Sequence, residues 1–357
     1  MGLKVGIIGT GFGSLVHYPG FYHHPDFEPA VIVGQDASKT KAIAKRLKAP
    51  NWSTDWRSIM ENPDIDVVSI VTPPKHHLEM VLAAVEANKH ILCEKPVSVT
   101  LKDAERMRLA IEEHGSVGMV NLEFRYIPNR AYLVELLKSG YIGKVHDFTI
   151  ILRNPSRLNP RDKGYNWWSE RSEGGGVLFS VGAHYIDMLI QVFNRIDRVY
   201  GKPSTLVGRR LNKKTGKMKR VTADDSFSGI FEIGDGATGI VQISSVSPFG
   251  RGTRIEFFGN EGYLGIDEQG RLWGARLSED EKPHVLEIPQ SLSIPKIEGA
   301  HPLVGPFMKL LYDFSGAIKM GRSLNPNFVD AYNLQRVLTA LQSSSSSGKA
   351  MNLGPFQ

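Results

Sequence analysis

The amino-acid sequence predicts an α/β region built on a doubly wound parallel sheet, followed by an α+β region built on an antiparallel sheet with a minority of helices. Two observations lead to this prediction. Continuous apolar strands alternate with helical stretches up to Asn121, and β-rich stretches with few helices follow from Lys144 onward. A chain of 357 residues also exceeds the size at which a single core usually keeps growing. We therefore expect one domain over residues 1–121 and a second over residues 122–357.

The first domain consists of repeated strand and helix units. Its strands are continuous apolar runs, which is typical of strands buried on both faces of a parallel sheet. The predicted strands cover residues 4–8, 30–33, 67–71, 90–93 and 117–120, and the first three predicted helices cover residues 12–23, 38–47 and 77–87. A fourth helix begins after Thr100, which caps it, and runs to about His114; Asp103 lies where a capping box places its carboxylate.

The second domain is expected to contain strands at residues 145–152, 226–233, 238–247 and 254–259, and helices at residues 183–193 and about 329–342. The serine run 343–347 is expected to be a fraying helix end. The most basic stretch, Arg209 to Arg220, is predicted to form an exposed hairpin. It lacks the interleaved aromatic residues of single-stranded nucleic-acid platforms, and the net charge is only +6, so no nucleic-acid partner is expected.

Cysteine and histidine usage argues against a structural metal. Cys93 is the one cysteine of the chain, so neither an internal disulfide nor a cysteine-rich metal site can form. The histidine pairs 23–24 and 76–77 are adjacent residues whose side chains point in different directions, which makes them poor chelates. The amino terminus leads directly into an apolar strand, so we expect a cytoplasmic protein without a membrane span.

A glycine-rich turn, Gly9-Thr10-Gly11-Phe12-Gly13, follows the first strand and precedes a helix. In phosphate-binding turns of this kind the first glycine makes the sharp turn and the second lets the backbone approach a pyrophosphate, while N–H groups at the helix start face the anion. Here the third glycine comes one place early, and Ser14 takes its usual position. The pattern predicts a bound dinucleotide cofactor.

The end of the second strand is expected to contact the ribose of that cofactor. An acidic residue there selects NAD through the 2′-hydroxyl, and a basic residue accepts the phosphate of NADP. Gln35 occupies the key position, Asp36 follows it and Lys39 lies close by. The sequence therefore leaves both NAD and NADP open.

Residues 64–97 resemble the glucose-fructose oxidoreductase and inositol dehydrogenase family, often written Gfo/Idh/MocA. The resemblance rests on a strand ending in Thr72-Pro73-Pro74, on His77 at the start of the next helix, and on Glu94-Lys95-Pro96 after the following strand. Later motifs fall in the family's order: Asn121 with Arg125, Gly140 to Val145, Gly174 to Gly176, Gly182 to Asp187, and Gly259 to Gly262. The resemblance covers nearly the whole chain. It implies an amino-terminal Rossmann domain, a carboxy-terminal open-faced antiparallel sheet, and an active site between them.

The resemblance also implies site residues. Cofactor contacts are expected at the glycine turn and at Gln35, Asp36, Thr72, Pro73, Pro74, His77, Glu94, Lys95 and Asn121. Lys95 is expected to bind the reacting hydroxyl or carbonyl oxygen. His184 corresponds to the family's general base, which takes the hydroxyl proton as hydride leaves carbon, and an imidazole titrates in the right range for that task.

One position departs from the family. Aspartate often lies four residues before the catalytic histidine, and here that position is Ser180. Without the carboxylate, either Asp187 or Tyr185 shares the task, or the chemistry differs, or Ser180 helps to position substrate. Ser180, Gly34 and the run from Tyr165 to Trp168 resemble the subgroup called glucose-fructose oxidoreductase domain-containing proteins.

The substrate cleft is expected to be shaped by Asn121 and Arg125. Trp167 and Trp168 either stack on a sugar face or pack under the sheet, since large aromatic side chains serve both purposes. The main hypothesis is an NAD(P)-dependent oxidoreductase that moves a hydride between the nicotinamide and a secondary alcohol or carbonyl of a sugar, cyclitol or related polyol.

Two alternatives remain: a redox-neutral NAD-dependent glycosidase, and a non-catalytic dinucleotide-binding regulatory protein. The departure at Ser180 keeps the second alternative open, whereas the presence of both Lys95 and His184 counts against it. A sheet with one open face would expose apolar surface, so a homo-oligomer, dimer or tetramer, through the carboxy-terminal sheet is expected.

Overall fold

The computed structural model describes residues 2–234 and 236–357. The chain forms two compact units. The first unit comprises the residues up to Ile127 together with Ile294–Tyr332, and the second comprises Pro128–Ser293 together with Asn333–Gln357. The chain thus leaves the first unit and later returns to it, which the sequence analysis did not anticipate. The functional division at residue 121 stays a prediction.

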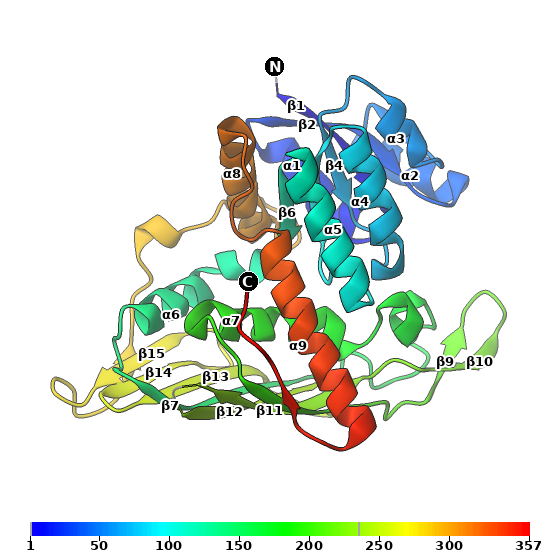
Figure 1. Ribbon diagram of the computed structural model, residues 1–357. Coiled ribbons are helices and arrows are strands. Elements are labelled where there is room, and N and C mark those ends of the chain that lie inside the picture. The colour runs from blue at the N-terminus through cyan, green and yellow to red at the C-terminus, as the bar shows by residue number, and fades with distance from the viewer. Residues whose placement is uncertain (1, 235) are drawn as a thin grey trace. The chain divides into compact units, whose positions relative to one another are not determined.

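The first unit contains a six-stranded, fully parallel sheet with the order β3-β2-β1-β4-β5-β6 (Figure 1). The strands are β1 (Leu3–Ile8), β2 (Phe27–Val33), β3 (Asn51–Ser53), β4 (Val67–Ile70), β5 (His90–Glu94) and β6 (Gly118–Asn121). This order is that of a Rossmann fold, so the predicted doubly wound sheet is confirmed. The strand order reverses between β1 and β4, and ligands of such sheets bind outside the carboxyl ends of the strands at this point.

The helices of the first unit cover both faces of this sheet. A five-residue π-helical turn, η1 (Gly13–His17), leads into α1 (Tyr18–His23). The other elements are α2 (Ala37–Leu47), α3 (Arg57–Glu61), η2 (Pro74–His76), α4 (His77–Glu86), α5 (Leu101–His114), η3 (Glu123–Tyr126) and α8 (Val304–Met320). The predicted cap of α5 is present, because the Thr100 hydroxyl accepts a hydrogen bond from the N–H of Asp103 at 3.1 Å.

Helix α8 completes the core of the first unit although it lies far along the chain. It packs against α1 (Figure 1), and its Phe307 and Phe314 are fully buried. The approach is close at Gly20 of α1, where an added Cβ would lie 2.3 Å from the Phe307 ring. Only glycine admits this aromatic ring.

The second unit is built on a nine-stranded sheet with the order β16-β15-β14-β13-β7-β12-β11-β8-β17. Its strands are β7 (Val145–Arg153), β8 (Arg198–Ser204), β11 (Ser226–Ile233), β12 (Ala237–Ser244), β13 (Gly252–Gly259), β14 (Gly262–Ile266), β15 (Leu272–Arg276), β16 (His284–Val285) and β17 (Met351–Asn352). Neighbouring strands are antiparallel except for β7 and β12, which are parallel. The predicted sheet is confirmed with this one parallel pair.

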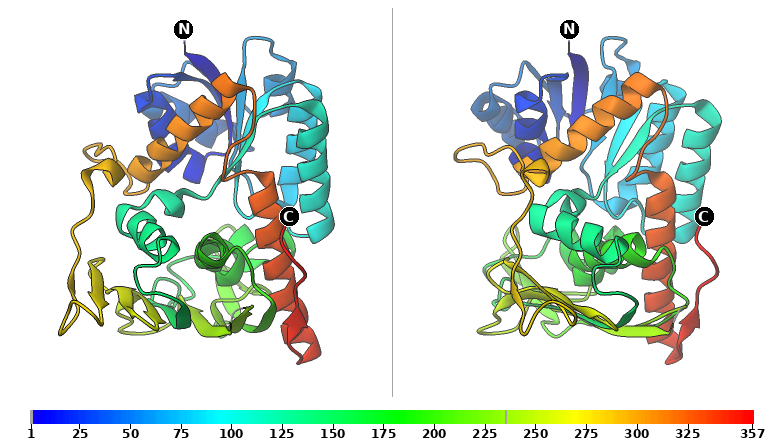
Figure 2. Two further views of the ribbon diagram at one scale, coloured as in Figure 1. Left: turned by 60° about the vertical axis from the view of Figure 1, so that its left-hand side comes forward. Right: turned by 90° about the vertical axis from the view of Figure 1, so that its left-hand side faces the viewer.

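One face of the nine-stranded sheet is covered by α6 (Pro128–Lys138) and α7 (Ala183–Phe193), as Figure 2 shows. Phe148, Phe193 and Phe257 form an aromatic cluster between α7 and the sheet. The opposite face carries a row of half-exposed apolar side chains, because Tyr200 pairs with Ile230 and Ile230 with Ile240 across three strands.

The basic stretch forms the predicted hairpin, with β9 (Arg209–Asn212) paired to β10 (Lys217–Arg220) in a separate two-stranded sheet. The expected fraying of the serine run is wrong. Helix α9 (Phe328–Ser347) continues through it, and Ser344 is fully buried with its hydroxyl accepting the N–H of Gly201 at 3.1 Å. Small serine side chains allow the helix to approach the backbone of β8 closely, and this contact holds its last turns in place.

The segment Arg171–Phe193 is long and apolar enough, by length and composition, to cross a membrane. It is a succession of short helical turns ending in α7, and 72% of its most apolar window is buried inside the protein. This is the pattern of a core helix, and no membrane span is indicated.

Candidate active site

The glycine turn lies at the carboxyl end of β1, next to the end of β4. Gly9 has a φ of +132°, and an added Cβ would lie only 2.3 Å from the carbonyl oxygen of Val71. Both the backbone conformation and the close approach therefore require glycine at this position. The N–H of Gly9 donates to the carbonyl of Val33 at 2.8 Å, which joins the turn to the end of β2.

Gly11 and Gly13 serve different purposes within the turn. A Cβ at Gly11 would meet nothing within 4 Å, so this residue faces open space. A Cβ at Gly13 would approach the Ile7 side chain to 3.3 Å, so this glycine brings the helical turn close to β1. The open backbone at Gly11 fits the approach of a pyrophosphate, and Gly13 performs the packing task of the usual third glycine. The residues present therefore fit a dinucleotide.

The end of β2 lies beside this turn. A Cβ at Gly34 would lie 2.5 Å from the side chain of Thr10, so glycine is needed there for packing. Gln35 is exposed, while Asp36 is the N-cap of α2 and accepts the N–H of Lys39 at 2.9 Å and the hydroxyl of Ser38 at 2.7 Å. Capping therefore occupies one oxygen of the Asp36 carboxylate, which was predicted to contact the ribose of the cofactor.

The segment Thr72-Pro73-Pro74 follows β4, and His77 fixes it. The imidazole of His77 is fully buried and lies 2.8 Å from the carbonyl of Thr72 and 3.1 Å from that of Val97. Burial lowers the pKa of His77. The ring thus joins the segments after β4 and β5, and its predicted direct contact with the cofactor stays a prediction.

A buried polar network lies under the carboxyl ends of β4, β5 and β6. His17 is fully buried, and its Nδ1 lies 2.8 Å from the Ser69 hydroxyl and its Nε2 2.8 Å from Glu94 Oε1. Asn121, also fully buried, donates from Nδ2 to the same Glu94 oxygen at 2.6 Å. The next residue after Glu94 is Lys95, which is partly exposed and precedes Pro96.

The network keeps Glu94 negatively charged. Burial alone would raise the pKa of this carboxyl, but the hydrogen bond and charge of His17, the positive charge of Lys95 and the hydrogen bond from Asn121 outweigh burial, and the pKa of Glu94 is lowered. The carboxylate therefore has a defined position directly before the predicted catalytic lysine. Asn121 Oδ1 is buried and accepts no hydrogen bond from the residues that the structure describes, so it can accept one from a ligand.

His17 and Ser69 were not predicted from the sequence. A signal was present for both. Ser69 is a polar residue in the otherwise apolar buried strand β4, and His17 lies on the helix that follows the glycine turn. A hydroxyl inside a continuous apolar strand requires a hydrogen-bond partner, and a polar residue on the first helix is the nearest source of one.

Arg125 was predicted to shape the substrate cleft. Its guanidinium donates to the Asp330 carboxylate at 3.1 Å, and both side chains are largely buried. Asp330 also accepts the N–H of Asn327. Arg125 therefore ties η3 to the start of α9, and its role in substrate binding stays a prediction.

In the second unit the three glycines before α7 allow a buried carboxylate to reach a helix start. The π-helical turn η6 (Leu178–Gly182) precedes α7, and the N–H of Leu178 donates to Asp224 Oδ2 at 2.8 Å. A Cβ at Gly176, which has a φ of +108°, would lie 2.2 Å from the other Asp224 oxygen. Burial raises the pKa of Asp224 to about 6.

Ser180 lies within η6, and its hydroxyl donates to the carbonyl of Gly176 at 2.6 Å. This bond directs the hydroxyl back along its own helix. His184, in the first turn of α7, is 5% exposed, and Asp187, one turn later, is also buried and accepts a hydrogen bond from Gln191 at 2.9 Å. The auxiliary roles predicted for Ser180 and Asp187 stay predictions.

Tyr185 has different partners. Its phenol lies 3.1 Å from both the Thr253 hydroxyl on β13 and the Arg130 guanidinium on α6, and the ring is almost fully buried. The residue anchors α7 to the sheet, and its predicted part in proton transfer stays a prediction.

Trp167 and Trp168 differ in exposure. The Arg157 guanidinium lies 3.7 Å from the ring centre of Trp168, whereas Trp167 is 40% exposed. Of the two predicted sugar-stacking residues, Trp167 has the more accessible ring. Within residues 2–234 and 236–357, no cluster of three or more His, Cys, Asp or Glu side chains could hold a metal ion.

Comparisons with known proteins agree with this geometry. Residues 3–122 match the pattern described as "Oxidoreductase family, NAD-binding Rossmann fold", and residues 131–265 match the "GFO/IDH/MocA C-terminal domain". Levoglucosan dehydrogenase of Pseudarthrobacter phenanthrenivorans is 28% identical and is covered over 96% of each chain. Glucose-fructose oxidoreductase domain-containing protein 2 of Homo sapiens is 24% identical, with 97% of this chain and 92% of that protein covered.

A solved structure of levoglucosan dehydrogenase, in complex with NADH and L-sorbose, superposes with a TM-score of 0.90 at 25% identity over 100% of both chains. The two matched patterns together span most of the sequence, including both the glycine turn and the helix that carries His184. This chain belongs to the Gfo/Idh/MocA family of oxidoreductases, whose Rossmann fold binds NAD.

Proposed function

We propose that this oxidoreductase transfers a hydride between NAD and a secondary alcohol or carbonyl carbon of a sugar or cyclitol. The observation that carries the proposal is the position of Lys95. It directly follows Glu94, which His17 and Asn121 hold at the carboxyl end of β5, the edge of the sheet where ligands of Rossmann folds bind. When bound, the nicotinamide supplies the hydride acceptor or donor.

The cofactor is held by the glycine turn and by the ends of the neighbouring strands. Gly11 leaves room for the pyrophosphate, and Gln35 with Asp36 faces the ribose end. The segment Thr72–Pro74 and Asn121 complete the site on the nicotinamide side. The buried oxygen of Asn121 supports this assignment, since a ligand N–H would satisfy it.

Two residues of the chain act on the substrate. The ammonium of Lys95 binds the substrate oxygen and stabilises negative charge that develops on it. The imidazole of His184 takes the hydroxyl proton in the oxidation direction and returns it in the reduction direction. Trp167 stacks on the sugar face, which its exposed ring supports.

The test is to incubate the protein with NAD⁺ and levoglucosan, L-sorbose, myo-inositol or other polyols and to record reduced nicotinamide by its absorbance. Lys95→Ala should lower kcat/KM by at least roughly 10²-fold, because a charge that stabilises the transition state is lost. Lys102→Ala, an exposed lysine on α5, is the matched control. Turnover by Lys95→Ala equal to that of the control would refute the assignment.

We also propose that the open face of the nine-stranded sheet mediates self-association. Tyr200, Ile230 and Ile240 are each more than 40% exposed and form one continuous row across β8, β11 and β12. Burying this row removes apolar surface from water. Ile230→Lys should shift the mass measured by light scattering from oligomer to monomer. Thr215→Lys, at an exposed position in the turn between β9 and β10, adds the same single charge away from this face and is the control for charge alone.

A further inference from the structure

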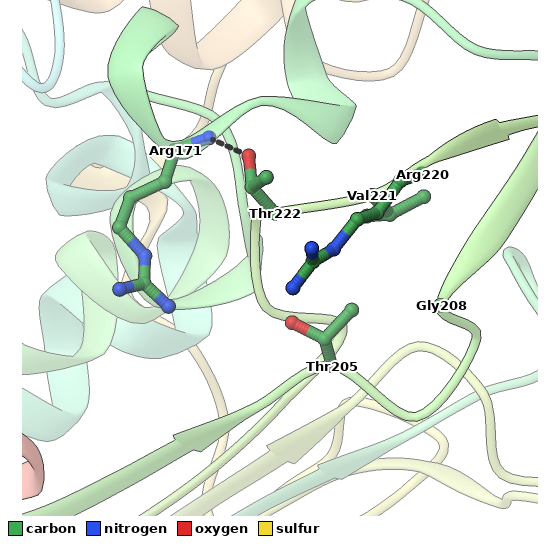
Figure 3. Close-up of a pocket in the computed structure, with 6 residues that line it drawn as sticks. All are labelled: Arg171, Thr205, Gly208, Arg220, Val221 and Thr222. Carbon is green, nitrogen blue, oxygen red and sulfur yellow. Dashed lines mark hydrogen bonds between the residues drawn. The ribbon is translucent and has the colours of Figure 1, made fainter.

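A pocket formed by the second unit alone lies at the base of the basic hairpin (Figure 3). It has a volume of about 450 Å³. Its lining residues are Arg171, Thr205, Gly208, Arg220, Val221 and Thr222. The hairpin has no part in the proposed hydride transfer, and neither does any of these six residues.

The lining carries two positive charges and no negative one. Arg171 comes from the short turn η5 (Arg171–Glu173) and Arg220 from the end of β10. Figure 3 shows the Arg220 side chain directed toward Thr205, whereas the Arg171 side chain extends from η5 on the other side of Thr222. In the part of the chain that the structure describes, neither guanidinium forms an ion pair or a side-chain hydrogen bond. Two like charges around one pocket repel each other, and an anion bound between them would offset this repulsion.

The acidic residues near the pocket are committed to other partners. Glu170 pairs with Lys219 at 3.0 Å. Asp225 accepts the N–H groups of Leu206 and Val207, each at 2.8 Å, from the loop that forms one wall of the pocket. Asp224, a third carboxyl, accepts the N–H of Leu178 at 2.8 Å, and burial raises its pKa although the nearby charge of Arg171 acts to lower it. All three carboxyls thus have other hydrogen-bond partners, and none forms an ion pair with either lining arginine within the described residues.

A hydroxyl in the lining has a proton to donate. Thr222 Oγ1 accepts the backbone N–H of Arg171 at 3.0 Å (Figure 3), and a threonine hydroxyl that accepts one bond can still donate its own proton to an acceptor. Thr205 donates its hydroxyl proton to the carbonyl of Ala223 at 2.9 Å, which fixes this wall of the pocket. A ligand oxygen would thus meet guanidinium N–H groups and one hydroxyl.

Further positive charge lies behind the wall. Arg210 is 1% exposed and lies 3.9 Å from Asp225; its Nη1 is buried and makes no hydrogen bond within the described ranges. Arg157, whose carbonyl accepts from Arg210 at 2.7 Å, has its pKa lowered to about 10 by burial and by the charge of Arg210. One carboxylate therefore faces two buried guanidinium groups, and the surroundings of the pocket have excess positive charge.

We propose that this pocket binds a small molecule carrying a phosphate group, held by Arg171, Arg220 and the Thr222 hydroxyl. A guanidinium donates to phosphate oxygens in a bidentate geometry, and a hydroxyl contributes a third donor, so a tetrahedral oxyanion matches this set of groups. The volume admits a small metabolite rather than a bare ion alone.

The test is calorimetric titration of the full-length protein with inorganic phosphate. NAD⁺ is present at saturation so that the glycine turn is filled. We expect saturable binding, and Arg171→Gln with Arg220→Gln should weaken it at least about tenfold, through loss of charge-assisted hydrogen bonds. Arg209→Gln is the matched control, because this exposed arginine of the same hairpin donates to the carbonyl of Met218.

If the control weakened phosphate binding as much as the double variant, the loss would reflect overall charge and the proposal would be overturned. Phosphate binding that the double variant leaves unchanged would also overturn it. A parallel titration with citrate tests the ligand class, and tighter binding of citrate than of phosphate would refute the tetrahedral oxyanion. Diffraction from crystals soaked in selenate provides an independent readout. An anomalous peak between Arg171 and Arg220 is expected, and a peak found only elsewhere contradicts the site.

Discussion

Two glycine-rich loops in this chain lead into a five-residue π-helical turn and then an α-helix, but the two helix starts differ in what lies beside them. In the first unit, Gly11 faces open space before η1 and α1. In the second unit, the N–H of Leu178 at the start of η6 already donates to the buried carboxylate of Asp224. Glycines before a helix start leave room for an anion near its N–H groups, and the surrounding atoms decide whether a side chain of the protein already occupies that room.

The difference between the two loops predicts that substitutions in one affect cofactor binding and substitutions in the other affect the stability of the fold. In the proposed function the first loop binds the cofactor, so changes at the open position Gly11 should affect binding more than folding. In the second loop, Asp224 already accepts the N–H of Leu178 at the start of η6, so changes there should affect folding more than cofactor binding.

The largest effect is expected at His184, which follows the second π-helical turn. His184→Asn should lower kcat by roughly 10² to 10⁴, because positioned acid or base catalysis contributes about that much. Binding of NAD⁺, measured by fluorescence titration, should be unchanged. His23→Asn, an exposed histidine at the end of α1, is the control. If His184→Asn and the control had the same kcat, the residue would not be the general base.

Gly176→Ala should destabilise the protein by roughly 3 to 5 kcal/mol, since a positive φ and overpacking each cost a few kcal/mol. Its φ is +108°, and the added Cβ would lie 2.2 Å from an oxygen of Asp224. Gly216→Ala is the matched control: its φ is +68° and its Cβ would meet nothing within 4 Å, so only the backbone cost remains. Urea unfolding measures both. Equal destabilisation would show that the contact with Asp224 has no role.

Asp224 should make the free energy of unfolding depend on pH. Burial raises its pKa from 3.8 to about 6, so between these values the folded protein binds more protons than the unfolded chain. The free energy of unfolding should therefore decrease through this group as pH rises from about 4 to about 6, by roughly 3 kcal/mol in total. Asp224→Asn should remove this slope, and its amide oxygen can still accept the N–H of Leu178.

Urea unfolding between pH 4 and pH 8 measures the slope for the wild type and the variant. Asp147→Asn, an exposed carboxyl on β7, is the control and should leave the slope unchanged. A wild-type slope that survives in Asp224→Asn would mean that another group titrates in this window.

Much of the first unit could be predicted because the sequence patterns that indicate its elements involve residues close together in the chain. The glycine turn, the apolar strands and the Thr100 cap each depend on neighbouring residues, and the structure contains all of them. Helix α8 was not predicted, although Phe307, Leu311 and Phe314 have the apolar spacing of a helix. Local spacing cannot show that this helix packs against α1, because that contact joins residues about 290 positions apart.

The candidate site was predictable where a motif marks it and not where packing creates it. Lys95 and His184 lie in recognisable motifs. The partners of Glu94, by contrast, come from η1 and β6 and depend on three-dimensional proximity. The same reason explains Tyr185, whose partners on α6 and β13 are distant in the sequence.

The smallest expected effect is at Gly11, and it tests the comparison from the other side. Gly11→Ala places a methyl group in open space, so the free energy of unfolding of the cofactor-free protein should stay within about 0.5 kcal/mol of the wild type. NAD⁺ should bind at least about tenfold more weakly, which corresponds to about 1.4 kcal/mol, because the methyl group occupies the path of the pyrophosphate. Gly316→Ala, in α8 with its nearest contact at 3.8 Å, is the control and should keep full affinity. If Gly11→Ala bound NAD⁺ like the control, the open space at this turn would not be the pyrophosphate site, and the two glycine loops would no longer differ in what they bind.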